Sequence, residues 1–208
     1  MSSQNIKIIN MEPKFEENIS KIEKKEDRIK NHAQEILGDL GLTMESLREK
    51  KVLDLGAGDA ELGVAAKKEG INITSMDIKM PDERPEHINY IVGDSNDAPF
   101  EDKSFDLIIS HAAPPIVMVN NTDDVKNILD EVKRLLKPGG EFRFGPLQIT
   151  PEVFDDEKLF TNEEEASFNT NQRIKRIKER SLELLRSIDP SIKKGGDTHD
   201  GFYILKKN

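Results

Sequence analysis

The sequence predicts a doubly wound α/β fold, in which an open and mostly parallel sheet carries helices on both faces. Three observations support this prediction. From residue 51 onward, short apolar segments typical of strands alternate with helical segments. Glycine-containing turns separate the two kinds of segment. The length of 208 residues suffices for one domain but is short for two.

The expected helices show apolar residues at spacings of three and four positions. Gly41 and Gly70 follow two of them, where glycine commonly ends a helix. Thr43 and Thr122 precede two others as N-caps. The expected helices are 15–40, 44–49, 60–68, 123–136 and a long helix within 162–188.

The expected strands are short apolar runs bounded by turn residues. The Lys137-Pro138-Gly139-Gly140 turn separates the helix at 123–136 from the fifth strand. The last two strands flank a Gly195-Gly196 turn, which predicts an antiparallel hairpin at one edge of the sheet. The expected strands are 51–55, 71–76, 88–92, 105–110, 141–149, 188–193 and 202–206.

Composition excludes several classes of protein. The chain has no Cys, which excludes a disulfide scaffold, a Cys-ligated metal and thiol catalysis, and we expect no metal site. Its 31 Lys and Arg against 40 Asp and Glu give a net charge of -9, which disfavours binding to a nucleic-acid backbone. No apolar run is long enough to span a membrane, and the polar start MSSQNIKIIN does not resemble a signal peptide. We therefore expect a cytoplasmic protein without a membrane partner.

The strongest local motif is a G-x-G turn between the first strand and the next helix, in the segment VLDLGAGDA at 52–60. A dinucleotide-binding turn would have a third glycine where this chain has Glu61, and a P-loop would need G-K-[ST]. Asp54, Asp59 and Glu61 surround the turn, so a pyrophosphate would face carboxylates. The charge instead favours a cationic cofactor without phosphate, such as S-adenosylmethionine.

Two further acids stand at strand ends. Asp77 follows Asp54 by 23 residues, close to the spacing at which such folds place an acceptor for the ribose hydroxyls, and Asp94 ends the third strand. The carboxyl ends of parallel strands open onto one crevice, so we expect the three aspartates to converge there.

Four segments resemble the successive motifs of class I S-adenosylmethionine-dependent methyltransferases. They are VLDLGAGDAELG, SMDIK, VGDSNDAPFEDKSFDLIIS and EVKRLLKPGGEFRF, and together they cover 51–144. The resemblance implies a seven-stranded sheet ending in an antiparallel strand. It also implies an N-terminal helical cap or lid over 1–50 and a single methyltransferase domain over 51–208.

The resemblance also implies a role for individual residues. The turn Gly56-Ala57-Gly58 would lie against the methionine part of the cofactor, and Asp54 would hold the loop or the amino group. Further contacts would come from Asp77 to the ribose, Ile78 to the adenine face, Asp94 to the adenine amine, Ser95 beside the ring, and Ser110 after the fourth strand.

Catalysis needs few dedicated groups, because a sulfonium is already a good leaving group and positioning supplies much of the acceleration. His111 is the one side chain after the fourth strand that titrates near neutral pH. It either orients or deprotonates the acceptor, or is a loop histidine hydrogen-bonded to the backbone.

For the acceptor we favour a small molecule, methylated on O or N by in-line displacement. The alternative is an RNA or protein acceptor, because 171–194 carries eight Lys and Arg against three acids. That segment could equally be a solvated helix face that balances the acidic run at 152–165. A further alternative is a cofactor-binding module without turnover, whereas Glu61 disfavours a nicotinamide oxidoreductase. His199 with Asp197 and Asp200 indicates a polar hairpin turn rather than a metal site.

Overall fold

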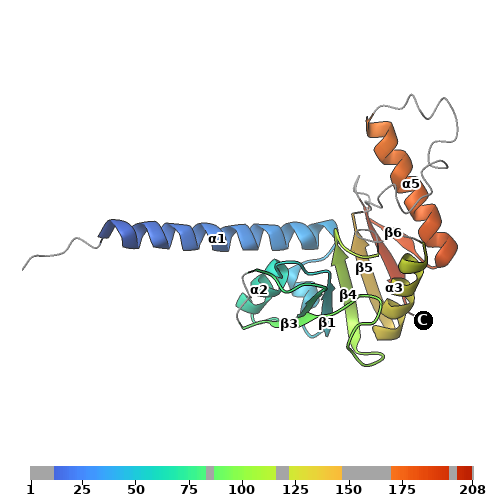
Figure 1. The fold of residues 1–208 in the computed structure, drawn as a ribbon, viewed down its shortest axis with the longest axis horizontal. Helices are drawn as coiled ribbons and strands as arrows, with labels where there is room; N and C mark the ends of the chain where they lie inside the picture. The colour runs from blue at the N-terminus through green and yellow to red at the C-terminus, as the bar shows by residue number, and fades with distance from the viewer. Residues whose placement is uncertain (1–11, 83–86, 116–121, 147–169, 197–200, 208) are drawn as a thin grey trace, which may run out of the picture.

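The computed structural model describes residues 12–82, 87–115, 122–146, 170–196 and 201–207. These residues form one seven-stranded sheet in the order β3-β2-β1-β4-β5-β7-β6 (Figure 1). The first five strands run parallel, and β7 runs antiparallel to both of its neighbours. The strands are β1 Val52–Leu55, β2 Thr74–Asp77, β3 Asn89–Val92, β4 Phe105–His111, β5 Leu136–Gly145, β6 Lys193–Gly195 and β7 Phe202–Lys206. The predicted seven-stranded, mostly parallel sheet is confirmed.

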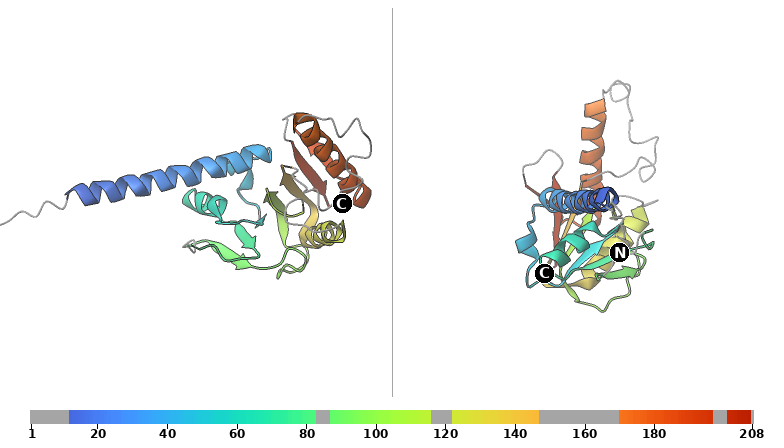
Figure 2. Two further views of the ribbon diagram at one scale, coloured as in Figure 1. Left: turned by 45° about the horizontal axis from the view of Figure 1, so that its top comes forward. Right: turned by 90° about the vertical axis from the view of Figure 1, so that its left-hand side faces the viewer.

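Helices cover both faces of the sheet (Figures 1 and 2). They are α1 Glu12–Asp39, the 3-10 helix η1 Met44–Leu47, α2 Glu61–Lys68, α3 Thr122–Leu135 and α5 Thr170–Ile188. Thr43 caps η1 as predicted, through a reciprocal hydrogen-bond pair with Ser46. None of the helices in the described ranges is long and apolar enough to cross a bilayer.

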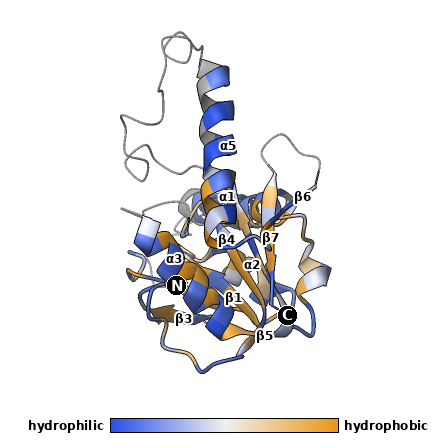
Figure 3. Ribbon diagram, turned by 90° about the vertical axis from the view of Figure 1, so that its right-hand side faces the viewer, coloured by the Kyte–Doolittle hydropathy of each residue, from blue (hydrophilic) through white to orange (hydrophobic). Residues whose placement is uncertain are grey.

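The core has two halves, one on each face, because successive side chains of a strand point to opposite faces. In β4, Ile108 belongs to the half that includes α3 and α5, while Leu107 and Ile109 belong to the half that includes α1 and α2. Figure 3 shows the apolar strands inside this double layer and the polar outer turns of α5 beyond it.

The sheet places its ligand crevice between β1 and β4. The strand order reverses at this pair, since β2 and β3 continue to one side of β1 and β5 continues beyond β4. Doubly wound folds bind their ligands at this switch point, outside the carboxyl ends of the strands. Asp54 of β1 stands in register with Ser75 of β2 and Ile109 of β4, so the ends of all three strands meet at one edge.

Helix α1 is long, and only part of it is packed. Its 28 residues span about 42 Å. The C-terminal part packs on the domain through Ile29, Ala33 and Leu37, whereas Ile19 and Ile22 are 40% and 59% exposed. Figures 1 and 2 show the N-terminal part projecting away from the sheet.

The end of α1 is attached to the far half of the chain. Arg143 of β5 donates hydrogen bonds to the carbonyls of Leu40, at 3.2 Å, and Gly41, at 2.8 Å. Its guanidinium also lies over the ring of Phe202 in β7, 5.3 Å from the centroid. Gly41 has a φ of +62°, and a Cβ there would lie 2.4 Å from the Phe202 ring. The position therefore needs glycine for both its conformation and the close approach.

Three strands begin at least three residues away from the predicted start. Strand β2 begins at Thr74 instead of at residue 71. Strand β5 begins at Leu136, the last residue of the predicted helix, because Leu136 pairs with Phe105 of β4. It also exchanges hydrogen bonds with Lys207 through Gly139 and Gly140. Strand β6 begins five residues later than expected, since α5 continues to Ile188 and a turn closed by Asp189 follows it. The expected continuation of β5 over 147–149 lies outside the described residues.

Candidate functional site

Two cavities meet at the G-x-G loop. The first, which we call the α1 cavity, has a volume of about 960 Å³ and lies between α1, the loop after β1 and the end of β4. The second, the strand-end cavity, has a volume of about 660 Å³ and lies at the ends of β2 and β3. Both are lined by Gly56, Gly58 and Ala112, so a ligand that passes the loop can occupy both.

The two glycines of the loop serve different purposes. Gly56 has a φ of +77°, and a Cβ there would lie 2.4 Å from the Cβ of Ala113, so it allows the loop after β4 to approach. Gly58 has a φ of +51°, and a Cβ there would have no atom within 4 Å. Gly58 therefore leaves space open at the junction of the cavities.

Asp54 is a buried carboxyl that lines the α1 cavity. Its residue is 5% exposed, and no residue in the described ranges donates a hydrogen bond to its side chain. Burial raises the pKa of Asp54 to about 7, and the negative charge of Asp77 adds to the increase. An unpartnered buried carboxyl is costly by itself, so this position favours a cationic ligand group.

Asp77 fixes the loop as well as lining the strand-end cavity. One carboxylate oxygen accepts a hydrogen bond from the backbone N–H of Gly58 at 3.0 Å, and the other accepts one from Lys79 at 3.2 Å. The hydroxyl of Tyr90 lies 3.0 Å from the carbonyl of Gly58 and 2.8 Å from that of Lys79. Burial and the nearby aspartates, Asp77 foremost, raise the pKa of Tyr90 to about 12, so it stays a donor at neutral pH.

The sequence interpretation missed Tyr90. The available signal was a hydroxyl-bearing aromatic residue in the middle of the third expected strand, on the strand next to Asp77.

The remaining strand-end residues form the outer part of the strand-end cavity. Asp94 accepts two hydrogen bonds from Asn96 through one carboxylate oxygen, at 2.8 and 3.0 Å. Ile78 is 62% exposed although it is apolar, and Ser95 lines the cavity beside Asp94. The cavity thus offers carboxylate acceptors and an apolar surface together.

Ser110 has a different position from the one expected. It is fully buried, it lines neither cavity, and its hydroxyl donates a hydrogen bond to the carbonyl of Pro114 at 2.5 Å. The hydroxyl therefore shapes the loop after β4 instead of facing the ligand space.

His111 lines the α1 cavity and is paired with a side chain. Its Nε2 lies 2.9 Å from a carboxylate oxygen of Asp39, the last residue of α1. The His111 side chain is 16% exposed. A carboxylate that accepts from Nε2–H fixes the tautomer in which Nδ1 can take a proton.

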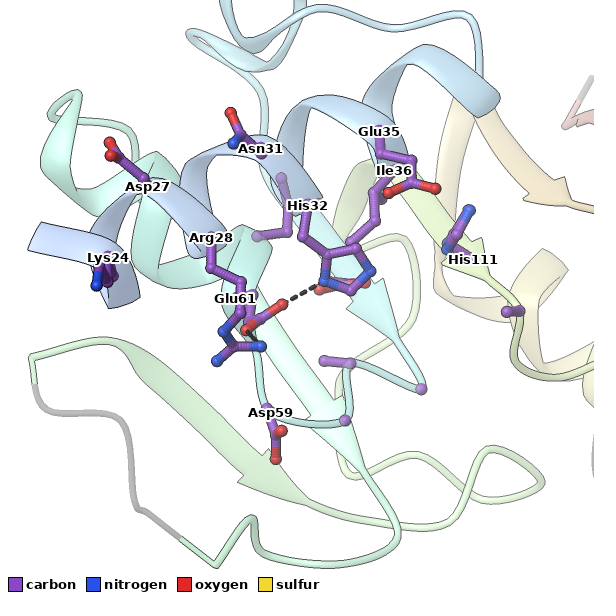
Figure 4. Close-up of a pocket in the computed structure, with 16 residues that line it drawn as sticks. Lys24, Asp27, Arg28, Asn31, His32, Glu35, Ile36, Asp59, Glu61 and His111 are labelled. Carbon is purple, nitrogen blue, oxygen red and sulfur yellow. Dashed lines mark hydrogen bonds and ion pairs between the residues drawn. The ribbon is translucent and has the colours of Figure 1, made fainter. Parts of the chain in front are cut away.

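The carboxylate of Glu61 pairs with side chains of α1. Its side chain is 9% exposed, and one oxygen lies 2.6 Å from Nη1 of Arg28 while the other contacts Nδ1 of His32 (Figure 4). The sequence interpretation placed Glu61 among the acids around the loop and attached no role to His32. The signal was the spacing of Arg28 and His32, which puts both on one face of a helix.

A metal site is the remaining question that the sequence raised. Within the described ranges, no group of three or more His, Asp or Glu is placed to hold a metal ion. His199 with its flanking aspartates, and the acidic run at 152–165, lie outside the described residues.

Residues 53–144 match a family model described as "Methyltransferase domain". The matched range includes the G-x-G loop and the ends of β2, β3 and β4, so it contains the residues that line both cavities after the strands. Over this range the chain is similar to a methyltransferase domain.

Named relatives of this chain are also methyltransferases. The chain is similar to the phthiotriol/phenolphthiotriol dimycocerosates methyltransferase of Mycobacterium leprae, with 27% identity over 76% of this chain and 57% of that protein. It is also similar to the demethylmenaquinone methyltransferase of Thermotoga maritima, with 31% identity over 49% of this chain and 44% of that protein. The chain spans about half the length of the curated relatives it matches.

Solved structures share the fold. A Methanococcus maripaludis protein assigned as an S-adenosyl-L-methionine-dependent methyltransferase aligns with all of this chain and 97% of its own, with 24% identity and a TM-score of 0.53. Human N-acetylserotonin methyltransferase, solved in complex with S-adenosylmethionine, aligns with 85% of this chain and 51% of its own, with 16% identity and a TM-score of 0.51.

Proposed function

We propose that this chain binds S-adenosylmethionine across the two cavities and directs its methyl group to a small-molecule acceptor in the α1 cavity. The observation that carries the proposal is the unpartnered, buried Asp54 carboxyl beside a glycine loop that joins two ligand-sized cavities. A cationic ligand without phosphate suits this arrangement better than a dinucleotide does.

The residues present fit the cofactor. Asp54 would hold the ammonium group of the cofactor, and the open space at Gly58 would admit the methionine part that lies against the loop. In the strand-end cavity, Asp77 would accept from the ribose hydroxyls, Ile78 would pack on the adenine, and Asp94 beside Ser95 would accept from the adenine amine. The bound cofactor would supply a methyl group on a sulfonium, which is a reactive electrophile.

The chain's own residues would hold the acceptor in line and control its protons. Helix α1 forms one wall of the α1 cavity, and we propose that 1–50 acts as a cap that limits access of water. His111, held by Asp39, would orient the acceptor and take a proton where the acceptor must lose one.

Two findings support a small-molecule acceptor over RNA or protein. The named relatives include enzymes whose names specify small molecules, demethylmenaquinone and the dimycocerosates among them. Helix α5, which carries much of the basic segment, lies on the opposite face of the sheet from α1. On α5, Lys175 and Arg176 also pair with Glu179.

Calorimetry with S-adenosylmethionine, S-adenosylhomocysteine and NAD tests the cofactor. We expect binding of the first two and not of NAD, and binding of NAD alone would contradict the proposal. Turnover is then tested with methyl-labelled cofactor and separate pools of metabolites and RNA. We expect label in metabolites. Label only in RNA would reverse the acceptor class, and cofactor binding without label in either pool would favour a binding module.

A further inference from the structure

The charged residues of the α1 cavity are unevenly paired. Glu61, which lines the cavity, pairs with Arg28 and His32, and Asp39 at the end of α1 pairs with His111. The other carboxylates that line the cavity have no partner in the described ranges. These are Asp27 and Glu35 of α1, and Asp54 and Asp59 at the loop after β1.

Among the described residues, one unpaired cation lines the same cavity. It is Lys24, which lies eleven residues before Glu35 on α1 and hence about 16 Å away along the helix axis. Figure 4 draws Glu35 at the end of the cavity nearest His111, with Lys24 at the opposite end. The end of the cavity near His111 therefore has the unpaired carboxylate of Glu35 and no free cation within the part of the chain that the structure describes.

We propose that the methyl acceptor is a small cationic amine, which is methylated on nitrogen in the α1 cavity. This inference rests on the proposed function and names the acceptor for it. The cavity has a buried carboxyl without a partner, Asp54, so it already favours one positive group. That group is the cofactor's ammonium, and Glu35 and Asp59 remain for the acceptor.

Charge separates this acceptor from the other classes. An amine is protonated at neutral pH and is attracted by the unpaired carboxylates. A carboxylate or phosphate acceptor in the α1 cavity would be repelled by Glu35 and Asp59. An uncharged alcohol would gain no ion pair with either of them.

The amine must lose one proton before it can act as a nucleophile. Nδ1 of His111 takes that proton, which frees the lone pair on nitrogen, while Asp39 holds Nε2. The lone pair then forms the nitrogen–carbon bond as the carbon–sulfur bond breaks, and the electron pair of that bond stays on sulfur. The products are a protonated methylamine and a neutral thioether, and the proton on His111 passes to solvent.

The test uses the full chain saturated with S-adenosylhomocysteine, so that only acceptor binding is measured. Benzylamine, benzyl alcohol and benzoate form a matched series that differs in charge, and calorimetry gives their affinities. We expect benzylamine to bind about tenfold more tightly than the other two. Equal or tighter binding of benzyl alcohol or benzoate would overturn the proposal.

Charge-removing variants identify the residues responsible. Glu35→Gln and Asp59→Asn should each weaken benzylamine binding about three- to tenfold and leave the affinity for S-adenosylhomocysteine unchanged. The matched control is Glu23→Gln, an exposed residue of α1 that does not line the cavity, and we expect no change from it. Unchanged benzylamine affinity in both cavity variants would rule the proposal out.

A panel of primary amines, alcohols and acids with methyl-labelled cofactor gives the second readout. Mass spectrometry should find methyl groups on amine nitrogen, and methylation of alcohols or acids in preference to amines would overturn the proposal. If S-adenosylhomocysteine itself does not bind, the proposed function fails, and this inference fails with it. If it binds without amine preference, only this inference fails.

Discussion

The carboxylate of Asp77 accepts a hydrogen bond from the backbone N–H of Gly58 at 3.0 Å. The end of β2 is thereby joined to the loop after β1, so the conformation of the G-x-G turn depends on the same side chain that faces the strand-end cavity. A residue proposed to contact the ribose thus also sets the shape of the loop that would contact the methionine part.

Replacing Asp77 should weaken cofactor binding for both reasons. We expect Asp77→Ala to lower the affinity for S-adenosylmethionine by about 1–3 kcal/mol, the usual cost of losing a hydrogen-bond partner from a binding site. Calorimetry measures the change. Asp82→Ala, at an exposed position after the same strand, is the control and should bind normally. Wild-type affinity in Asp77→Ala would refute the assigned role.

The pH dependence of binding follows from Asp54. Its pKa is raised to about 7 by burial, so the carboxyl is largely protonated below that pH and ionised above it. A cationic cofactor prefers the ionised form, so its affinity should rise with pH between about 6 and 8 and then level off. Calorimetry over this range checks the prediction. Asp54→Asn should bind the cofactor more weakly, and its affinity should no longer rise with pH. If the affinity of the variant still rises with pH, a group other than Asp54 causes the pH dependence.

The same residue should limit the stability of the free protein. The folded-state pKa of Asp54 lies above the unfolded value of about 3.9, so folding is favoured by protonation. That contribution is present below about pH 4 and is lost as the pH rises through 7. We therefore expect Asp54→Asn to stabilise the ligand-free protein at pH 8 by about 1–4 kcal/mol, because the variant removes a buried negative charge that the wild type carries at that pH.

Urea unfolding at pH 8 and pH 4.5 measures this effect. The gain in the free energy of unfolding should be much smaller at pH 4.5, because the wild-type carboxyl of Asp54 is already protonated in the folded protein. Equal gains at the two pH values would point to packing rather than charge.

The two glycines of the loop should respond differently to alanine. Gly56→Ala places a Cβ 2.4 Å from Ala113 at a φ of +77°, so we expect a loss of about 3 kcal/mol or more in the free energy of unfolding. Gly58→Ala meets no atom within 4 Å, so it should cost only the backbone strain, about 1 kcal/mol. Its methyl group nevertheless enters the space between the cavities.

We expect Gly58→Ala to reduce cofactor affinity while the fold is retained. Thermal unfolding and calorimetry on the same sample separate the two effects. Normal cofactor binding by a folded Gly58→Ala variant would place the cofactor elsewhere.

The contact of α1 with Glu61 should hold the helix on the domain. Arg28→Ala removes one partner of a carboxylate that is 9% exposed, and we expect a loss of about 1–3 kcal/mol. Hydrogen exchange of residues 24–36 should also become faster. Arg48→Ala is the matched control, because its pair with Glu45 is exposed, and it should cost less than about 1 kcal/mol. Equal effects of the two variants would mean that the Glu61 contact has no special role.

Much of the fold followed from local pattern. The strand–helix alternation and the apolar periodicity identified the elements of the parallel sheet, because each element buries a face that its own sequence shows. Boundaries were predicted less well where pairing in space decided them. Strand β5 includes Pro138 and the two glycines after it because Leu136 pairs with β4 and the glycines exchange hydrogen bonds with Lys207, which no local signal reports.

In the candidate site too, the positions of some residues followed from the sequence and the positions of others did not. The proposed cofactor residues at strand ends line the cavities because the end of a parallel strand fixes where the side chain lies, and Asp77 is the example. Ser110 does not line either cavity, because the loop after β4 turns back and the carbonyl of Pro114 accepts a hydrogen bond from the Ser110 hydroxyl. The partnership of Asp39 with His111 spans 72 residues, and only the docking of α1 brings the pair together.

The attachment of α1 to Arg143 and Phe202 has a consequence for how the protein folds. The first helix of the chain ends against side chains from β5 and β7, so its last turn can dock only after residues more than a hundred positions later are in place. Contacts of such long sequence separation form late, because a large loop must be closed first. During synthesis, α1 would therefore be made before the strands against which it docks, and it would be among the last elements to reach its final place. The wall of the α1 cavity would be completed only when the final strand has paired.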